Sequence, residues 1–146
     1  VMDSLHTTLY EGWLAGANGF GGGTTNHAWS GGPLTVIAQY LMGVSVREPG
    51  WKVFSVCPVP VRFQKADISI PTIRGMVKTA FQLGETTDVY SITVPRDTHA
   101  YYYLPCQDAA QAKGAEAYIC TDSKVQKEGR LCLLLPAGNY KFKVRK

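Results

Sequence analysis

Charged residues are scarce at the start of the chain. Residues 1–50 hold one basic and three acidic residues, a formal charge of −2, whereas residues 51–146 hold fourteen basic and eight acidic ones, a charge of +6. Ten of the fifteen glycines also lie in the first fifty positions. A stretch with so few charges to face water is expected to be covered by other protein.

The chain also lacks long apolar runs and clustered basic residues. No apolar run reaches the roughly 18 residues of a transmembrane helix, so we expect no membrane span. The first residues have neither the basic nor the apolar region of a signal peptide, and they favour an excised or processed chain. Basic residues are scattered except for Lys141, Lys143, Arg145 and Lys146 at the very end, which alternate with Phe142 and Val144 like the solvated face of a terminal strand. No cluster alternates basic and stacking residues, so nucleic acid is not an expected partner.

Cysteine spacing excludes a common type of metal site. The chain has four cysteines, Cys57, Cys106, Cys120 and Cys132, and no Cys-x-x-Cys pair. Three scattered histidines do not supply a ligand set either, so we expect no metal and no other cofactor. One or two disulfides would suit a periplasmic or secreted protein, which we favour over a cytoplasmic one. The alternative, which we favour for the cysteines themselves, is four small buried residues on strands.

One segment has a helical pattern. Pro33 suits the first position of a helix over residues 33–42, and Gly43 suits the position just past its end. Apolar residues cover most of the circumference, which predicts a helix buried from more than one side. The six glycines of residues 12–23 predict an irregular segment before it, and residues 47–50 predict a turn and a domain boundary.

From Trp51 onward the pattern becomes that of strands. Short alternating runs are separated by proline and glycine, which is typical of a β-sandwich. We therefore predict a mainly β fold: an antiparallel β-sandwich of about eight strands, preceded by one buried α-helix and an irregular Gly-rich N-terminal segment. Residues 109–115 are expected to form a loop or a single helical turn. The predicted strands are residues 52–57, 66–70, 75–83, 89–94, 100–104, 116–121, 130–135 and 140–145.

Glu11 is the strongest catalytic candidate. It lies between Tyr10 and Trp13, and a carboxylate against aromatic rings has its charged form desolvated, which raises its pKa and suits acid–base chemistry. The alternative is a surface glutamate in a loop. Hydrolysis of a glycoside needs two carboxyl groups, and only Asp3 and Glu48 accompany Glu11 in the first fifty residues.

Residues around Glu11 are of the kinds that contact sugars. Trp13 and Trp29 offer rings for the C–H face of a sugar, while Asn26 and His27 offer hydrogen bonds to hydroxyls. His27 has an alternative role in capping or packing the start of the helix. The run of tyrosines at 101–103 is a further candidate sugar platform, but strand alternation points its members to opposite faces and favours core positions instead.

Two motifs resemble a known family. Residues 7–13 (Thr-Thr-Leu-Tyr-Glu-Gly-Trp) and 26–33 (Asn-His-Ala-Trp-Ser-Gly-Gly-Pro) resemble bacterial α-L-rhamnosidases of glycoside hydrolase family 78. The similarity continues to Glu-Pro-Gly-Trp-Lys at 48–52 and covers about the first 57 residues. The remainder matches in kind only. The resemblance implies that residues 1–50 are the terminal segment of an (α/α)6 catalytic barrel and that residues 51–146 are a C-terminal β-sandwich domain.

The resemblance also implies a role for each candidate. The family inverts configuration, Glu11 matches its general base, His27 matches a histidine of the rhamnose pocket, and Trp13 and Trp29 lie where aromatic walls would be. The general acid belongs to an earlier part of the barrel. The implied partners are a rhamnose-containing glycan and the remainder of the barrel, and the isolated chain is expected to be inactive. The alternative is a non-catalytic sandwich that binds carbohydrate or only supports the barrel.

Overall fold

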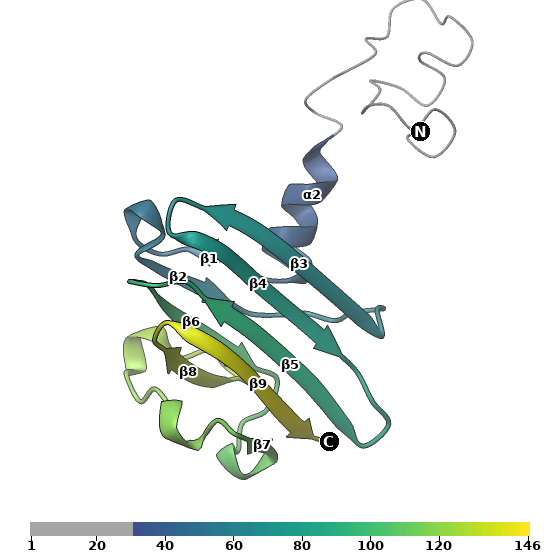
Figure 1. The fold of residues 1–146 in the computed structure, drawn as a ribbon. Coiled ribbons are helices and arrows are strands. Elements are labelled where there is room, and N and C mark those ends of the chain that lie inside the picture. The colour runs from purple at the N-terminus through teal and green to yellow at the C-terminus, as the bar shows by residue number, and fades with distance from the viewer. Residues whose placement is uncertain (1–30) are drawn as a thin grey trace, which may run out of the picture. The chain divides into compact units, whose positions relative to one another are not determined.

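The computed structural model describes residues 31–146 (Figure 1). The chain divides into two compact units, residues 1–37 and 38–146, and the second unit contains all nine strands of the described region. None of the described helices has the length and apolar character needed to cross a membrane.

A helix lies where the sequence predicts one. The α-helix α2 (Gly32–Val36) continues as a π-helical turn at Ile37–Leu41, with Pro33 in its first turn. Gly43 follows with a φ of +66°, and a Cβ atom there would collide with the carbonyl oxygen of Cys57. Glycine is required at this position because it alone adopts positive φ without strain and admits the close approach of another backbone.

The burial of this helix differs from the expectation. Leu34 is 66% exposed, Val36 55% and Tyr40 72%, and no described residue of Gly32–Leu41 is buried. Met42, just past the helical turns, is completely buried. The prediction of a helix buried from more than one side is therefore not met in the described residues.

Two sheets form the sandwich. The four-stranded sheet has the order β1-β2-β6-β8, and the five-stranded sheet has the order β3-β4-β5-β9-β7. All pairs are antiparallel except β2 with β6, which is parallel. The strands are β1 (Ser45–Val46), β2 (Val53–Val56), β3 (Lys65–Thr72), β4 (Gly75–Gln82), β5 (Thr87–Val94), β6 (His99–Leu104), β7 (Ala112–Lys113), β8 (Leu131–Leu135) and β9 (Gly138–Arg145).

Alternate residues of both sheets build the core between them. The rings of Tyr102 on β6 and Phe142 on β9 meet across the two sheets at a centroid distance of 5.9 Å. Along β5, Tyr90 and Ile92 are buried while the residues between them are only partly covered. Each fully buried large apolar side chain stabilises the fold by roughly 1.5–3 kcal/mol. The predicted class, a mainly β sandwich, is confirmed.

Four elements differ from the prediction. Residues 116–121 are not a strand: they hold a 3₁₀ turn at Glu116–Tyr118 and a single β-bridge from Ile119 to Leu133. The two-residue strands β1 and β7 are too short to give an alternating pattern. Strand β3 passes through Pro71 instead of ending before it, because β3 is an edge strand where the missing N–H of proline removes no ladder bond.

The cysteines are unpaired thiols in this structure. Cys106 and Cys132 are buried, whereas Cys57 and Cys120 are partly exposed. Only Cys132 lies within a strand, β8. The expectation of four buried strand residues therefore holds in part.

Candidate functional site

The catalytic candidates of the sequence lie outside the described residues. These are Glu11, Trp13, Asn26, His27 and Trp29, and their assignments stay predictions. Within residues 31–146, no group of three or more histidine, cysteine, aspartate or glutamate side chains lies close enough together to hold a metal ion.

The described residues form a candidate site on the outer face of the five-stranded sheet. Three adjoining pockets of about 260, 470 and 510 Å³ lie along this face. The first two share Ala80 and Lys141, and the last two share Thr93 and Asn139. They therefore form one open groove, which we call the outer groove. It follows β5 from Val89 to Pro95, a length of about 20 Å at the usual rise per strand residue.

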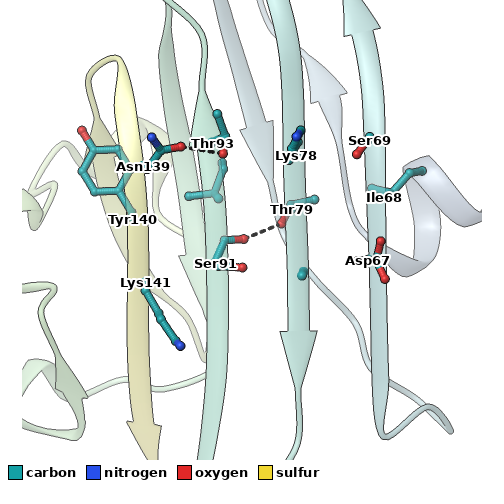
Figure 2. Close-up of a pocket in the computed structure, with 12 residues that line it drawn as sticks. Asp67, Ile68, Ser69, Lys78, Thr79, Ser91, Thr93, Asn139, Tyr140 and Lys141 are labelled. Atoms are coloured by element: carbon teal, nitrogen blue, oxygen red, sulfur yellow. Dashed lines mark hydrogen bonds between the residues drawn. The ribbon is translucent and has the colours of Figure 1, made fainter.

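Strand register sets the chemistry of the groove. Because side chains alternate, every second residue of each strand faces outward, and register aligns these residues in rows across the sheet. Small residues in the middle form the floor, and longer polar side chains flank them. The register gives two consecutive rows: Asp67, Ala80, Ser91 and Lys141, then Ser69, Lys78, Thr93 and Asn139. Figure 2 labels all of these residues except Ala80.

Two hydrogen bonds hold this surface. The Thr93 hydroxyl donates to Asn139 Oδ1 at 2.7 Å, and the amide nitrogen of Asn139 lies on the side away from Thr93 (Figure 2). The Thr79 hydroxyl donates to the carbonyl oxygen of Ser91 at 3.2 Å and ties β4 to β5. The groove thus offers an amide, hydroxyls, ammonium groups and a carboxylate, a set that matches a ligand rich in hydroxyl groups.

The outer groove suits binding and not hydrolysis. Asp67 is the one carboxylate among the described residues that line it. Cleavage of a glycoside takes two carboxyl groups on opposite sides of the bond. The groove can therefore hold a polar ligand but lacks the pair that would cut a sugar chain.

Positive charge dominates this face of the sheet. Exposed cationic side chains occupy outward positions on four of its five strands, and Lys113 on β7 lies directly opposite Lys143 on β9. The single ion pair in the described part of the chain, Lys146 with Asp88 at 3.3 Å, lies at the end of the sheet. We call the surface formed by these exposed cationic side chains the cationic face; its residues are Lys65, Lys78, Lys113, Lys141, Lys143 and Arg145.

Only part of the cationic face could be predicted from the sequence. The alternating pattern predicts that Lys141, Lys143 and Arg145 lie on the solvated face of a strand, and the exposure of all three confirms this prediction. The position of Lys78 and Lys113 on the same face depends on strand order and register, which the sequence pattern does not give.

The outer side of the four-stranded sheet is covered. The Tyr103 hydroxyl donates to the Val125 carbonyl oxygen at 2.8 Å, and the Cys120 amide donates to the Cys132 carbonyl oxygen at 2.9 Å. Burial raises the pKa of Tyr103 to about 12 and that of Cys132 to about 12. Tyr102 is buried on the inner side, so the run of tyrosines is a packing feature and not a sugar platform.

Solved structures share this fold. The structure of Streptomyces avermitilis alpha-L-rhamnosidase complexed with L-rhamnose matches with a TM-score of 0.66 at 18% identity over 80% of this chain. The alpha-L-rhamnosidase from Dictyoglumus thermophilum matches with a TM-score of 0.69 at 24% identity over 85%. The enzyme from Aspergillus terreus matches with 0.63 at 23% over 84%. The chain spans 11%, 14% and 12% of these three proteins, respectively.

The sequence itself identifies the family. No curated protein matches the chain. Residues 43–118, more than half of the chain, match the family described as the bacterial alpha-L-rhamnosidase C-terminal domain. This segment runs from the glycine after the helical turns through β1–β7 to the Glu116–Tyr118 turn. The chain therefore belongs to the family of bacterial α-L-rhamnosidase C-terminal domains.

Proposed function

We propose that the chain is the C-terminal part of a glycoside hydrolase that removes terminal α-L-rhamnose with inversion. Family membership over residues 43–118 is the observation that carries this proposal. The similar solved structures are α-L-rhamnosidases of which this chain spans only 11–14%, so most of the catalytic barrel would lie outside it.

Glu11 acts as the general base in this proposal. It removes a proton from the water that attacks the anomeric carbon, while a carboxylic acid from the rest of the barrel protonates the leaving oxygen. Inversion requires the two carboxyl groups to stand roughly 6.5–9.5 Å apart, which leaves room for the water. Asn26 and His27 would hold sugar hydroxyls, and Trp13 and Trp29 would pack on the C–H face of the ring.

The exposed helix supports the proposal of a missing barrel. Leu34, Val36 and Tyr40 present large apolar surfaces on Gly32–Leu41. Clustered exposed apolar side chains mark contact sites with other protein. In the parent enzyme the remaining helices of the barrel would cover them, which also accounts for the low charge of residues 1–50.

Substitution of Glu11 in the parent enzyme tests the catalytic role. Glu11→Gln should lower kcat for 4-nitrophenyl α-L-rhamnoside by about 10²–10⁴-fold, the usual effect of losing a general base. Glu48→Gln is the matched control, since Glu48 is an exposed carboxylate of the same segment, and it should leave kcat unchanged. Equal kcat values for Glu11→Gln and the parent would contradict the assignment.

The isolated chain provides a second test. Because the general acid is expected outside these 146 residues, the purified chain should not hydrolyse the same substrate above the level of its Glu11→Gln variant. Turnover well above that variant would show that the chain contains both carboxyl groups and would overturn the division of the active site.

Carbohydrate binding without cleavage is a second candidate function. The outer groove favours it over a purely supporting role, since Asp67, Asn139 and Lys141 place an acceptor and donors along one open channel. Binding of a glycan by the isolated chain would separate this function from simple support of the barrel.

A further inference from the structure

We propose that the outer groove binds a carboxylate-bearing polysaccharide, with the sugar chain lying along β5. The choice of a glycan over other polyanions rests in part on the proposed function, whereas the requirement for negative charge comes from the groove itself.

The cationic face has an unusual internal arrangement. Lys113 and Lys143 lie directly opposite each other on neighbouring antiparallel strands, on the same face of the sheet as the outer groove but outside its lining. Like charges in this position destabilise a sheet, and within the described residues neither lysine has a carboxylate within 4.0 Å. A bound anion between the strands would turn this repulsion into attraction. Local arrangements that disfavour the fold are expected where a protein binds a ligand.

Positive charge follows the whole length of the groove. Lys65 and Lys141 line one end, Lys78 lines the middle, and Arg74 and Arg96 line the other end. The Nε atom of Arg74 donates to the Gly50 carbonyl oxygen at 3.2 Å, which fixes the side chain and leaves its terminal nitrogens for a ligand. A row of cations over about 20 Å matches a polymer that carries an anion at regular intervals, and not a single small anion.

The neutral groups of the groove fit a sugar chain. Ser69, Ser91 and Asn139 lie between the cations and can exchange hydrogen bonds with hydroxyl groups. Asp67 is an acceptor in the same groove. Its carboxylate can accept a hydrogen bond from a sugar hydroxyl, and the backbone of DNA has no hydroxyl group to donate one.

Stacking surfaces for nucleic-acid bases are missing from the described lining. Two aromatic residues, Phe81 and Tyr140, are part of it. Phe81 is buried in the core, where its ring packs against Tyr90. Tyr140 is held by its neighbours. Its ring stacks on Phe142 at an interplanar angle of 8°, meets Tyr118 edge-on, and its hydroxyl donates to the Pro136 carbonyl oxygen. Proteins that bind single-stranded nucleic acid present free aromatic faces to the bases. The lining therefore favours a glycan over a nucleic acid.

The test measures binding by the 146-residue chain at low salt. The probes are polygalacturonate, its fully methyl-esterified form, and a deoxythymidine oligonucleotide of similar length. We expect polygalacturonate to bind with an affinity that falls as salt rises, and both the neutral ester and the oligonucleotide to bind at least about tenfold more weakly.

Matched triple variants separate the groove from overall charge. Lys65→Gln, Lys78→Gln and Lys141→Gln together, all at residues that line the groove, should weaken polygalacturonate binding by about tenfold or more. Lys52→Gln, Arg62→Gln and Lys124→Gln together remove the same charge from exposed positions outside the groove lining. This control should change the affinity by less than about twofold. Circular dichroism checks that both triple variants are folded. The single variant Lys78→Gln tests the groove with a smaller change to the protein.

Three results would overturn the proposal: equal losses in the two triples, tighter binding of the oligonucleotide, or no binding of polygalacturonate. Failure of the catalytic assignment is distinguishable. Glu11→Gln in the isolated chain should leave polygalacturonate binding unchanged, whatever that substitution does to hydrolysis by the parent enzyme.

Discussion

The outer faces of the two sheets differ although both sheets share one core. On the four-stranded sheet, outward residues such as Tyr103 and Cys132 are buried, with Val125 and Cys120 of the connection from β7 to β8 hydrogen-bonded beside them. On the five-stranded sheet, outward residues such as Lys78 and Lys141 are exposed along the outer groove (Figure 2). The same alternation of side chains thus yields a structural layer on one side and a polar binding surface on the other.

The difference is visible strand by strand. Strand β5 alternates between buried and partly covered residues, as expected for one solvated face. Strand β8 is buried at four of its five positions, with only Leu134 exposed, as expected for a strand covered on both sides. We infer that substitutions on the covered face change stability, whereas substitutions on the cationic face change binding.

Truncation of Tyr103 should have the largest effect. Tyr103→Ala removes a buried ring and the hydrogen bond to Val125, and it should lower the free energy of unfolding by about 3–5 kcal/mol. Lys141→Ala, the matched change on the cationic face, should alter it by less than about 0.5 kcal/mol. Urea unfolding at neutral pH measures both. A loss on Lys141→Ala comparable to that on Tyr103→Ala would remove the distinction between the two faces.

Alkaline pH should weaken the covered face next. Burial raises the pKa of Tyr103 from 10.0 and that of Cys132 from 9.0, both to about 12. The unfolded chain then releases these protons first, so their contribution is complete below about pH 9 and is lost as pH rises towards 12. We expect the free energy of unfolding to fall by about 2–4 kcal/mol between pH 8 and pH 11.

The control for this pH dependence is the double variant Tyr103→Phe and Cys132→Ala. Its free energy of unfolding should fall less steeply over the same range. The lysines of the cationic face are present in both proteins, so their contribution cancels in the difference. Identical slopes for the two proteins would mean that the covered face does not hold these groups in their protonated form.

Removal of a tyrosine hydroxyl from β6 should change the free energy of unfolding by about 1 kcal/mol or less. The sign of the change should depend on which face of the sheet the tyrosine occupies. Tyr103→Phe loses the hydrogen bond to Val125 and should cost about 1 kcal/mol. Tyr102 is the internal control, because its buried hydroxyl has no hydrogen-bond partner among the described residues, and the nearby Thr79 hydroxyl donates to Ser91 instead. Tyr102→Phe should therefore be neutral or stabilising, and thermal unfolding of the two variants checks the sign of each change.

Most of the fold could be predicted from the sequence because alternation is a local signal. Six predicted strands, β2–β6 and β8, lie within two or three residues of the expected limits, and β9 begins two residues early. The parallel pairing of β2 with β6 and the single bridge at Ile119 depend on contacts between distant residues. No window of neighbouring residues contains that information.

The candidate site was less accessible to sequence analysis. A groove needs the register of β3, β4, β5 and β9, which places Asp67 in the row of Lys141, 74 positions later in the chain. The motif around Glu11 could be recognised because its residues are neighbours in sequence, but its role stays a prediction. A motif of neighbouring residues can therefore be recognised in the sequence, whereas a surface formed by four strands can be identified only from the structure.

Removal of the repulsion between Lys113 and Lys143 should have the smallest effect on stability. It should raise the free energy of unfolding, whereas the changes above lower it. Lys113→Gln removes the repulsion with Lys143 and should raise the free energy of unfolding by about 0.5 kcal/mol at low salt. The gain should vanish near 1 M salt, where the screening length is only about 3 Å. Lys124→Gln, at an exposed position outside the cationic face, should change little at either salt concentration. A loss of stability in Lys113→Gln at low salt would mean that the two ammonium groups do not repel. A bound anion would then relieve no repulsion between Lys113 and Lys143.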